Sequence, residues 1–484
     1  MNTIVDEGLV SFKELEQKIF RYACELAREI TVEILENYDK ELAEGRDKKQ
    51  YRGKGKRQTS IKTIYGEVEY SRNVYRTETE DGQTAYVYLL DQAMQMDKIG
   101  LISTNLAEKI ALTVTELSYR VSADTISNTC GQSISAGGVW NMMQRLGERI
   151  DEEESHAVKQ MNADQTEGER IIPVLFEEMD GVWLNIQDEQ HKKLPKQEMK
   201  VFTMYEGWDA DKEKANRSTL VGKQMLAGME KSTEFHEKRE ACIRKKYNAD
   251  EISQRILNGD GGSWVKEPYD PDTIFQLDRY HIYQEILRKI SHQEAQKEVR
   301  RLFEEEKLDE MFEYIEIYAN SVESADEKDK SSKKARELYQ YLGNNRDGLL
   351  PYDKRGIEIP QPQEGIIYKG MGVQESQNCT VITMRMKHRR MRWSVKGANN
   401  LAKALYRKEN NDLIATIDRY TDGLIFTVQM QEIIETLSAS KAPKKDGHGN
   451  IYADMINHHI PLFDAIQTAS RKAFKRALGI QSVC

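Results

Sequence analysis

The chain has 484 residues and a net charge of −9, and 39% of its residues are hydrophobic against 31% charged. This length leaves room for two to four domains with proper hydrophobic cores. No apolar run approaches the roughly 18 to 20 residues that cross a bilayer, and the first residues lack the basic and apolar regions of a signal peptide. We therefore expect a cytoplasmic protein with no membrane partner.

Five cysteines are dispersed along the sequence, and none of them forms a CxxC pair. An odd, scattered set argues against both a disulfide framework and a zinc finger. We therefore expect inert thiols at these positions, which are Cys24, Cys130, Cys242, Cys379 and Cys484.

Basic charge gathers in two segments in spite of the acidic total. Residues 46–62 carry eight Lys or Arg against one acid, and residues 383–396 carry six Lys or Arg with one His and no acid. The compensating acid lies elsewhere, notably in residues 151–154 and 304–316. Such segregation suits a separate electrostatic footprint for an anionic polymer. Each basic run could equally be a solvated face.

In chain order, residues 10–37 are expected to form an amphipathic helix, because apolar residues recur at steps of three and four. They are Phe12, Leu15, Ile19, Ala23, Ala27 and Ile30. The Gly- and Lys-rich segment 45–58 is too polar and flexible to pack by itself. Alternating β-favouring residues around the Tyr65-Gly66 corner then predict a β-hairpin. Its basic side chains could bind a phosphate backbone, and they include Arg52, Lys54, Lys56 and Arg57.

Residues 104–150 indicate three helices. A first helix has an apolar stripe of Leu106, Ile110, Val114 and Leu117, and a short second helix over 122–128 has Ser122 as a possible cap. A turn around Gly131 leads to a third helix with Val139, Met142, Met143, Leu146 and Ile150 inward. Short helix, glycine turn and longer helix is the helix-turn-helix pattern, in which Asn141, Gln144 and Arg145 would face DNA. An ordinary α-helical domain would show the same pattern.

The character of the sequence changes after residues 151–169, which are expected to form a linker helix and a loop. Three β-favouring runs follow at 170–180, 181–187 and 199–208, then a mostly helical stretch at 210–255. Short apolar runs at Ile256-Leu257 and Ile274–Leu277 indicate further strands. Strand, strand, strand, helix, strand, helix is the order of an RNase H-like fold, which belongs to the α/β class.

A helical block from Tyr283 to about Leu342 interrupts this α/β region. Its inward face would carry Leu308, Met311, Phe312, Ile315 and Ala319, with a polar loop at 324–334. A Pro/Gly-rich connector at 351–365 returns to the core, and the polar remainder ends in a possible helix at 462–477.

The predicted organisation is an α/β, RNase H-like catalytic core with an all-helical insertion, preceded by a mainly helical DNA-binding region with a small β-hairpin. Its parts are an N-terminal helix (1–45), the basic segment and hairpin (46–100), the helix-turn-helix-like region (101–150), the first part of the core (170–283), the helical insertion (284–350), the second part of the core (351–410) and a C-terminal helical region (411–484).

Three carboxylates are candidates for a metal site. Asp180 ends the first predicted strand, Asp260 follows the fourth, and Glu375 comes after Gly372, on either a helix or a strand. Hard cations such as Mg²⁺ prefer carboxylate oxygen, and paired ions promote phosphoryl transfer. Taken singly, an Asp after a strand is more often a turn former or helix cap, and paired carboxylates would equally suit glycoside hydrolysis.

Several short motifs occur together in a fixed order. They are MDGVW around Asp180, NGDGGSW around Asp260, the D-x-x-H of Asp278 and His281, the E-S-x-N of Glu375, Ser376 and Asn378, RMK at 385–387 with Trp393, Ser394 and Gly397, and RQTSIKTIYGEVEYSRNVYR upstream. In this combination, from about residue 40 to residue 480, the chain resembles bacterial insertion-sequence transposases of the ISLre family, within the Mutator-like group of DDE transposases.

The resemblance implies an RNase H-like core in which Asp180, Asp260 and Glu375 hold Mg²⁺ or Mn²⁺, while Asp278 and His281 line the site. The implied reaction is phosphodiester hydrolysis at the element's terminal inverted repeats, followed by transesterification into target DNA. The implied assembly is a homo-oligomer on double-stranded DNA, in the cytoplasm and associated with the nucleoid. The segment 383–396 could contact flanking DNA by charge and stacking, through Arg385, Lys387, Arg389, Arg390, Arg392 and Trp393.

Two other functions remain open at this point. The first is a non-catalytic DNA-binding protein derived from a transposase, which would bind terminal-repeat DNA and never cut it. The second is another nuclease with an RNase H-like fold. For His281 alone, a structural role is also compatible with the sequence.

Overall fold

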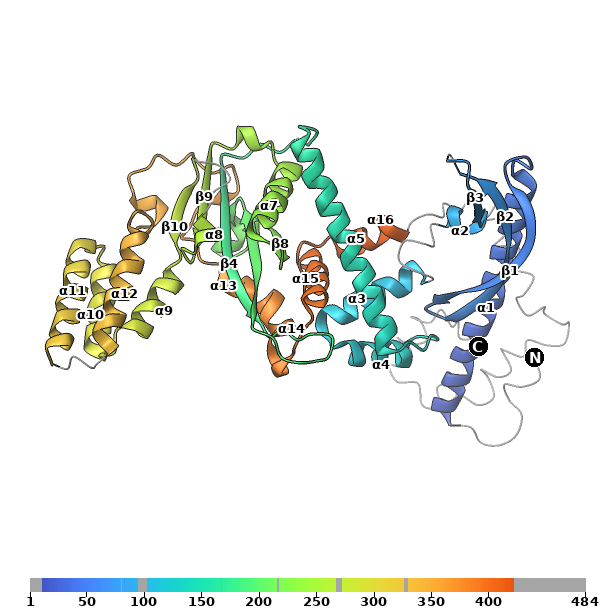
Figure 1. The fold of residues 1–484 in the computed structure, drawn as a ribbon, viewed down its shortest axis with the longest axis horizontal. Helices are drawn as coiled ribbons and strands as arrows, with labels where there is room; N and C mark the ends of the chain where they lie inside the picture. Colours follow the sequence, from blue (N-terminus) through green and yellow to red (C-terminus); the bar gives the residue numbers. More distant parts are fainter. Residues whose placement is uncertain are drawn as a thin grey trace, which may run out of the picture.

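The structure is a computed structural model, and it describes residues 11–79, 81–94, 102–166, 168–215, 217–266, 272–325 and 330–421. It is a mixed α/β protein with several sheets. Figure 1 shows four parts in a row: a helical block at one end, a larger sheet, a group of helices, and a small sheet with one long helix at the other end. No helix of the described residues is long and apolar enough to cross a membrane.

The long N-terminal helix is confirmed, but its predicted apolar stripe is not buried. Helix α1 (Phe12–Gly45) begins at Ser11, which forms a capping box with Glu14. Phe12 and Ile19 are 78% and 53% exposed, because only the second half of the helix packs on the neighbouring sheet. That contact includes buried Asp39, whose carboxylate accepts hydrogen bonds from the backbone and side-chain nitrogens of Asn73.

The predicted hairpin is also confirmed. Strands β1 (Arg52–Thr63) and β2 (Gly66–Glu78) pair antiparallel, β3 (Thr84–Val87) adds to β2, and the short helix α2 (Leu89–Ala93) follows. Gly66 has a φ of 125°, a left-handed conformation that favours glycine at this corner. The segment 45–58, predicted to be too polar and flexible to pack by itself, is exposed from Arg52 to Gln58, and its pairing with β2 makes this stretch the start of β1.

The three predicted helices of the next region are present. They are α3 (Thr104–Glu116), α4 (Tyr119–Thr129) and α5 (Ala136–Asn162), and the predicted inward residues of α5 are all buried. The second helix begins earlier than predicted: Ser118 is its cap, and Ser122 is buried inside it. Leu117 is 37% exposed because α3 ends before it.

A five-stranded sheet forms the centre of the molecule, in the order β10-β9-β4-β5-β8. Strand β4 is parallel to β9, β9 is parallel to β10, and β5 is antiparallel to β4 and β8. The strands are β4 (Val174–Leu184), β5 (Gln197–Tyr205), β8 (Gln224–Gly228), β9 (Gln254–Gly259) and β10 (Ile274–Leu277).

Two predictions for this sheet are wrong. The runs 170–180 and 181–187 were expected to be separate strands, but β4 continues through Gly181, which pairs with Lys200. A Cβ on Gly181 would lie 1.9 Å from a carboxylate oxygen of Glu198, so this glycine allows a close approach and makes no turn. The stretch 210–255 is not mostly helical, since it contains β8.

Short elements and one longer helix surround the sheet. A second small sheet joins β11 (Ile366–Ile367), β6 (Gly207–Asp209) and β7 (Leu220–Val221). The helices between the strands are α6 (Ala210–Lys214), α7 (Ser232–Lys246) and α8 (Ser263–Lys266), and 3₁₀ turns lie at Ala249–Glu251, Arg346–Gly348, Tyr352–Lys354 and His388–Arg390.

The helical block between the fifth strand and Glu375 is confirmed. Its helices are α9 (Arg279–Lys289), α10 (Gln293–Glu304), α11 (Leu308–Ala325) and α12 (Lys330–Asn344), and they share a hydrophobic core of their own (Figure 1). The predicted inward residues Met311, Phe312, Ile315 and Ala319 are buried in it. The predicted loop at 324–334 is too long, because α11 and α12 include its two ends; residues 326–329 lie outside the described part.

From Gln374 to Thr421 the chain is mainly helical. It forms α13 (Gln374–Gln377), a π-helical turn (Asn378–Thr383), α14 (Met384–Met386), α15 (Val395–Glu409) and α16 (Leu413–Thr421). Glu375 therefore lies on a helix. Helix α15 was not predicted, and it packs against α5 and β8. Helix α16 lies at the start of the predicted C-terminal helical region 411–484. The predicted helix at 462–477 lies outside the described residues.

Candidate metal centre

Three predicted site residues meet at the end of the parallel part of the sheet. Asp180, His281 and Glu375 each offer one ligand atom, and these three atoms all lie within 4.8 Å of one another. They come from β4, α9 and α13, which are far apart in the sequence. The fold thus brings together three side chains of which each is about a hundred residues from the next in the sequence.

Asp180 does not end its strand, as the sequence suggested, because β5 continues to pair with β4 up to Leu184. It does lie where the parallel pairing with β9 ends, one residue after Met179. Its carboxylate accepts hydrogen bonds from the Gly181 backbone N–H at 2.7 Å and from the Asn378 side-chain amide at 2.6 Å. Asn378, part of the E-S-x-N motif, therefore orients the central carboxylate.

Asp260 directly follows β9, as predicted. Its Oδ1 accepts a hydrogen bond from the Gly262 backbone N–H at 2.8 Å, and its backbone carbonyl accepts one from the Tyr341 hydroxyl at 2.8 Å. Burial raises the pKa of the Asp260 carboxyl, and the negative charge of Asp180 raises it further. Asp260 is therefore an electrostatic neighbour of Asp180, although it lies outside the 4.8 Å group.

The charges at this site repel one another. Burial, and then the charge of Asp180, raise the pKa of Glu375 above its ordinary value. Burial alone would lower the pKa of His281, but the hydrogen bond and charge of Asp180, with Asp278 and Asp260, raise it to about 9. His281 Nε2 lies 3.6 Å from Asp180 Oδ1. The carboxylates around His281 thus favour the protonated ring, which is a counter-charge to them.

Asp278 is in the site region, but both of its oxygens are engaged. Oδ1 caps α9 by accepting from the Tyr280 backbone N–H at 2.7 Å, and Oδ2 accepts from the Asn258 side chain at 2.7 Å. Asp278 thus fixes the start of the helix that carries His281.

A buried carboxylate that the sequence interpretation missed anchors the helix of Glu375. Glu178 is fully buried in β4, two residues before Asp180. It accepts hydrogen bonds from three successive backbone N–H groups, Gly372, Val373 and Gln374, at 3.0, 3.2 and 3.1 Å. The Tyr205 hydroxyl at 2.6 Å and the Asn258 amide at 3.2 Å complete its partners. Alternation along the strand could have revealed it, since Glu178 and Asp180 share one face.

A fourth carboxylate, Glu198 on β5, lies above Gly181 and was also missed. Burial is the main cause of its raised pKa, and the charges of Asp260 and Asp180 add to it. The sequence carried no signal for Glu198, because only the antiparallel pairing of β4 and β5, in which Glu198 lies opposite Trp183, brings it over Gly181.

The residues present fit a hard divalent cation. Asp180, Asp260 and Glu375 offer only carboxylate oxygen, the donor that Mg²⁺ and Mn²⁺ prefer. Burial raises the pKa of Asp260 and Glu375, and the charge of Asp180 raises both further, with His281 as a nearby counter-charge. A bound cation would neutralise this charge.

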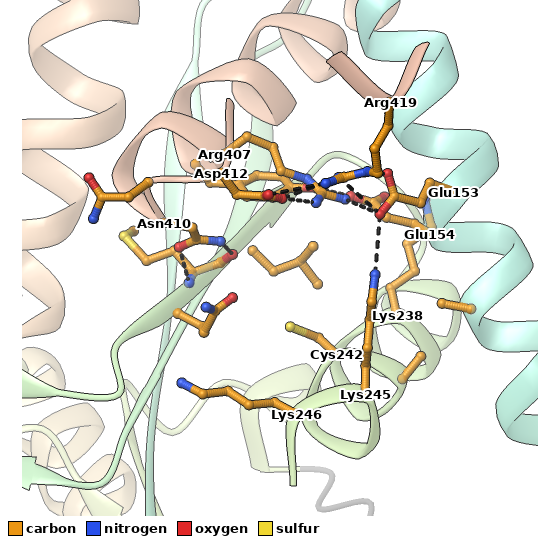
Figure 2. Close-up of a pocket in the computed structure, with 17 residues that line it drawn as sticks. Glu153, Glu154, Lys238, Cys242, Lys245, Lys246, Arg407, Asn410, Asp412 and Arg419 are labelled. Atoms are coloured by element: carbon orange, nitrogen blue, oxygen red, sulfur yellow. Dashed lines mark hydrogen bonds and ion pairs between the residues drawn. The ribbon is translucent and has the colours of Figure 1, made fainter. Parts of the chain in front are cut away.

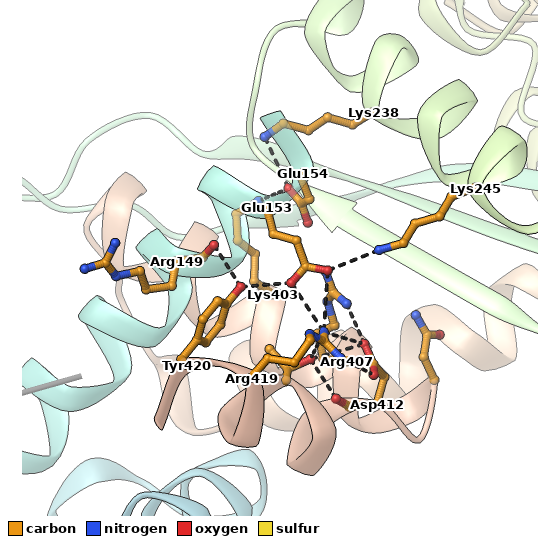
Figure 3. A network of polar contacts seen from close by, with 12 residues as sticks. Arg149, Glu153, Glu154, Lys238, Lys245, Lys403, Arg407, Asp412, Arg419 and Tyr420 are labelled. Atoms are coloured by element: carbon orange, nitrogen blue, oxygen red, sulfur yellow. Dashed lines mark hydrogen bonds and ion pairs between the residues drawn. The ribbon is translucent and has the colours of Figure 1, made fainter. Parts of the chain in front are cut away.

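A second carboxylate group, Asp151, Glu154 and Glu230, has comparable spacing but different surroundings. The Lys403 ammonium lies 3.1, 2.5 and 3.2 Å from these three carboxylates. Lys238 contacts the same three residues, and Figure 3 shows it beside Glu154. Two lysines thus take the place that a cation would occupy, and this group is no metal site.

A hollow of about 520 Å³ lies next to this ion-pair cluster, between α5, α7 and α15 (Figure 2). Its charged lining is already paired: Lys245 with Glu153, Arg407 with Asp412, and Lys246 with the Gly222 carbonyl. The hollow therefore offers little free charge to a ligand.

The predicted DNA-contacting residues divide into two sets. Those on the surface are Arg52, Lys54, Lys56 and Arg57 on β1, Asn141 and Arg145 on α5, and Lys387, Arg390 and Arg392 after α14. The side chain of Arg389 lies outside the described part.

Three of the DNA-contact predictions are wrong, because these side chains are buried. Gln144 bonds to the Asn400 amide at 2.9 Å, between α5 and α15. Arg385 donates to the Val114 carbonyl at 2.7 Å and lies over the ring of Trp393. Trp393 donates its indole N–H to the Met386 carbonyl at 2.8 Å. These two residues join the 383–396 segment to the helices and are not available to DNA.

The described chain is thus a mixed α/β protein with a carboxylate cluster at the end of its central sheet. It belongs to a family described as "Uncharacterised protein family (UPF0236)", whose model matches residues 4–417.

Relatives of similar length support this membership. The chain is 23% identical over 396 residues to "UPF0236 protein in vanSb 3'region" of Streptococcus gallolyticus, covering 80% of this chain and 81% of that protein. It is 24% identical over 416 residues to "UPF0236 protein TTE0610/TTE0881/TTE1053/TTE2432" of Caldanaerobacter subterraneus, covering 84% and 79%. A second protein of that organism, "UPF0236 protein TTE2489", is 24% identical over 417 residues, covering 85% and 81%.

Proposed function

We propose that this protein is a DNA transposase of the DDE type, which cleaves an insertion sequence at its terminal inverted repeats and joins the freed ends to target DNA. The observation that carries the proposal is the convergence of Asp180 and Glu375 with His281, and of Asp260 beside them, at the end of the paired strands β4 and β9. These are the residues that the resemblance to ISLre-family transposases implies for the catalytic site.

The topology supports an RNase H-like core. Numbered in chain order, the strands of the central sheet run 3-2-1-4-5, and the second strand is antiparallel to the first. The helical block lies between the fifth strand and the helix of Glu375, where an insertion was expected. Open sheets of this kind place their chemistry at strand ends.

Asp180, Asp260 and Glu375 would hold Mg²⁺ or Mn²⁺, which when bound activates the attacking oxygen and stabilises the leaving one in phosphoryl transfer. The chain's own groups have separate tasks. Protonated His281 presents positive charge beside Asp180, where a phosphate oxygen would be attracted. Glu178 and Asp278 fix the helices that carry Glu375 and His281.

Exposed basic residues support double-stranded DNA as the partner. Arg52, Lys54, Lys56 and Arg57 lie on the edge strand β1, and its outer edge is free of a neighbouring strand in the described structure. Arg145 on α5 and Lys387 after α14 add charge elsewhere. The family resemblance further suggests a homo-oligomer.

The names of two relatives are consistent with a mobile element. One joins four locus designations from a single strain and another, "UPF0236 protein TTE1650/TTE2708", joins two. A gene carried by a transposing element is expected at several places in one genome.

The test is DNA cleavage by the full chain on duplexes that end in the repeats flanking its gene. With Mg²⁺ or Mn²⁺ the wild type should nick and join these ends, and EDTA should stop it. Asp260→Ala should lower the rate by roughly 10²- to 10³-fold or more, as when a group that stabilises transition-state charge is lost. Its DNA affinity should stay unchanged.

Asp211→Ala is the matched control, because Asp211 is an exposed residue of α6. Cleavage by Asp260→Ala at the wild-type rate would refute the assignment of Asp260. A wild-type protein that binds the repeats and never cuts them would support the alternative of a non-catalytic DNA-binding protein.

A further inference from the structure

An exposed tryptophan near the start of α5 lines a hollow. The hollow has a volume of about 580 Å³, and residues from β1, the start of α5 and the start of α15 line it. Trp140 is 42% exposed there. A single exposed aromatic side chain is not by itself a binding site, so the groups around Trp140 decide what the hollow can bind.

The indole of Trp140 has room for a ligand. Gly137 and Gly138 precede it on α5, so two neighbouring positions carry no side chain. Among the described residues, Trp140 takes part in no recorded ring stacking, cation–ring contact or hydrogen bond. By contrast, Trp393 is buried, with its N–H bonded to Met386.

The charged groups around Trp140 favour an anion. The lining holds the cations Lys62, Arg145 and Lys396 against a single acid, Glu148. Lys396 pairs with Glu148 at 2.6 Å. Lys62 and Arg145 make no recorded ion pair within the part of the chain that the structure describes. Asn141 is exposed beside Trp140 and offers an amide that can both donate and accept.

An aromatic platform, free cations and an amide together match the chemistry of a nucleotide. Bases stack on aromatic rings, and Lys or Arg binds the adjacent phosphates. In a duplex each base face is covered by its neighbours, so only an unstacked base could lie on an indole. We infer that the hollow around Trp140 binds an unpaired nucleotide of single-stranded DNA, with its base on the indole and its phosphates at Lys62 and Arg145.

This inference rests on the proposed function in that it takes DNA as the ligand. It goes beyond the proposed function because it requires a region of the DNA in which the two strands are separated. The carboxylate cluster gives no information about such a region. The predicted helix-turn-helix contact would read a duplex; the buried position of Gln144 and the exposed position of Trp140 favour a stacked single strand at this place.

The first experiment measures tryptophan fluorescence of the full chain in EDTA as an oligothymidylate of about 12 nucleotides is added, within the range of single-strand site sizes. Quenching is expected for the wild type and for Trp183→Phe, and it should be absent from Trp140→Phe. Trp183 is the matched control, since it is 51% exposed on β4 and does not line this hollow.

The second experiment compares affinities for the single strand and for a duplex of the same sequence. Trp140→Ala should weaken single-strand binding roughly tenfold, the size expected for one stacked base, and leave duplex binding within about twofold. Arg145→Ala should reduce the salt dependence of single-strand binding, because a phosphate contact is lost.

Three results would overturn the inference: quenching that persists in Trp140→Phe, an equal loss for single strand and duplex, or no single-strand binding by the wild type. The last would leave a protein or peptide as the occupant. Because EDTA is present, the outcome does not depend on cleavage. If the wild type cuts DNA but Trp140→Ala binds single strands as well as the wild type does, only this inference is refuted. If the wild type binds single strands through Trp140 but does not cut DNA, only the proposed reaction is refuted.

Discussion

Two groups of carboxylates in this protein have similar spacing and opposite electrostatics. At the candidate metal centre, burial and mutual repulsion raise the pKa of Asp260 and Glu375. In the ion-pair cluster between α5, α7 and α15, neighbouring cations overcome burial and lower the pKa of Asp151 and Glu230. Figure 3 shows part of the reason: Lys238 of α7 and Lys403 of α15 lie beside Glu154 of α5.

The difference shows what separates a structural cluster from a candidate site. In the ion-pair cluster the chain itself supplies the positive charge, through Lys238 and Lys403. At the candidate metal centre His281 and Lys387 supply positive charge, but the pKa of Glu375 stays raised, so negative charge remains for a cation to neutralise. Carboxylate spacing by itself does not distinguish the two, whereas the charge around it does.

The largest expected effect comes from removing a cation from the ion-pair cluster. Lys403→Met should lower the free energy of unfolding by about 3–5 kcal/mol, because it leaves buried carboxylates such as Glu154 uncompensated. Urea unfolding followed by circular dichroism measures this change.

The matched control is Lys408→Met on the same helix. Lys408 is 38% exposed and pairs with Glu116 at the surface, so its loss should cost no more than about 1 kcal/mol. If Lys403→Met were as stable as the wild type, the carboxylates around Lys403 would not be ionised. The contrast between the ion-pair cluster and the candidate metal centre would then be wrong.

A smaller effect is expected from the anchor of the candidate metal centre. Glu178→Gln keeps the side-chain shape but replaces an acceptor with an amide that cannot accept from Gly372, Val373 and Gln374 together. Losing such hydrogen bonds, worth about 1–3 kcal/mol, should lower cleavage roughly tenfold or more by letting Glu375 move.

A metal titration distinguishes this positioning role from general damage. Raising Mg²⁺ or Mn²⁺ should restore part of the Glu178→Gln activity and none of the Asp260→Ala activity, since only the former keeps its carboxylates. Glu189→Gln, an exposed loop change, is the control. Equal failure of both variants at all metal concentrations would contradict an anchoring role.

The smallest effect is a pH dependence of stability in the ion-pair cluster. Burial alone would raise the pKa of Glu153, but Arg407, Tyr420, Lys245 and Arg419 lower it to about 2 (Figure 3). Because the folded pKa is depressed, Glu153 contributes stability above its ordinary pKa of about 4.5, and this contribution is lost as the pH falls toward about 2.

Urea unfolding between about pH 5 and about pH 3 tests this dependence. The wild type should lose stability faster than Glu153→Gln over this range, so the two curves should approach each other toward the acid end. Parallel curves would mean that Glu153 is not held ionised by its neighbours.

The sequence predicted many elements of this fold because their patterns are local. The hairpin at Tyr65-Gly66, the inward face of α5 and the helical block before Glu375 each show a periodicity that a short segment determines by itself. Strand β8 and helix α15 were missed, since they are stabilised by packing against each other and not by a strong pattern of their own.

The sequence by itself determined which carboxylates are candidates, through the order of the motifs around Asp180, Asp260 and Glu375. Tertiary structure alone decided which of the predicted DNA-contacting residues are exposed: Gln144, Arg385 and Trp393 are buried because distant partners cover them. It alone revealed Glu178 and Glu198, whose roles depend on hydrogen bonds and strand register across the sheet. The charged groups that surround each carboxylate come from segments remote in the sequence. The sequence could therefore suggest candidate metal ligands, but only the folded structure shows which of them lie together.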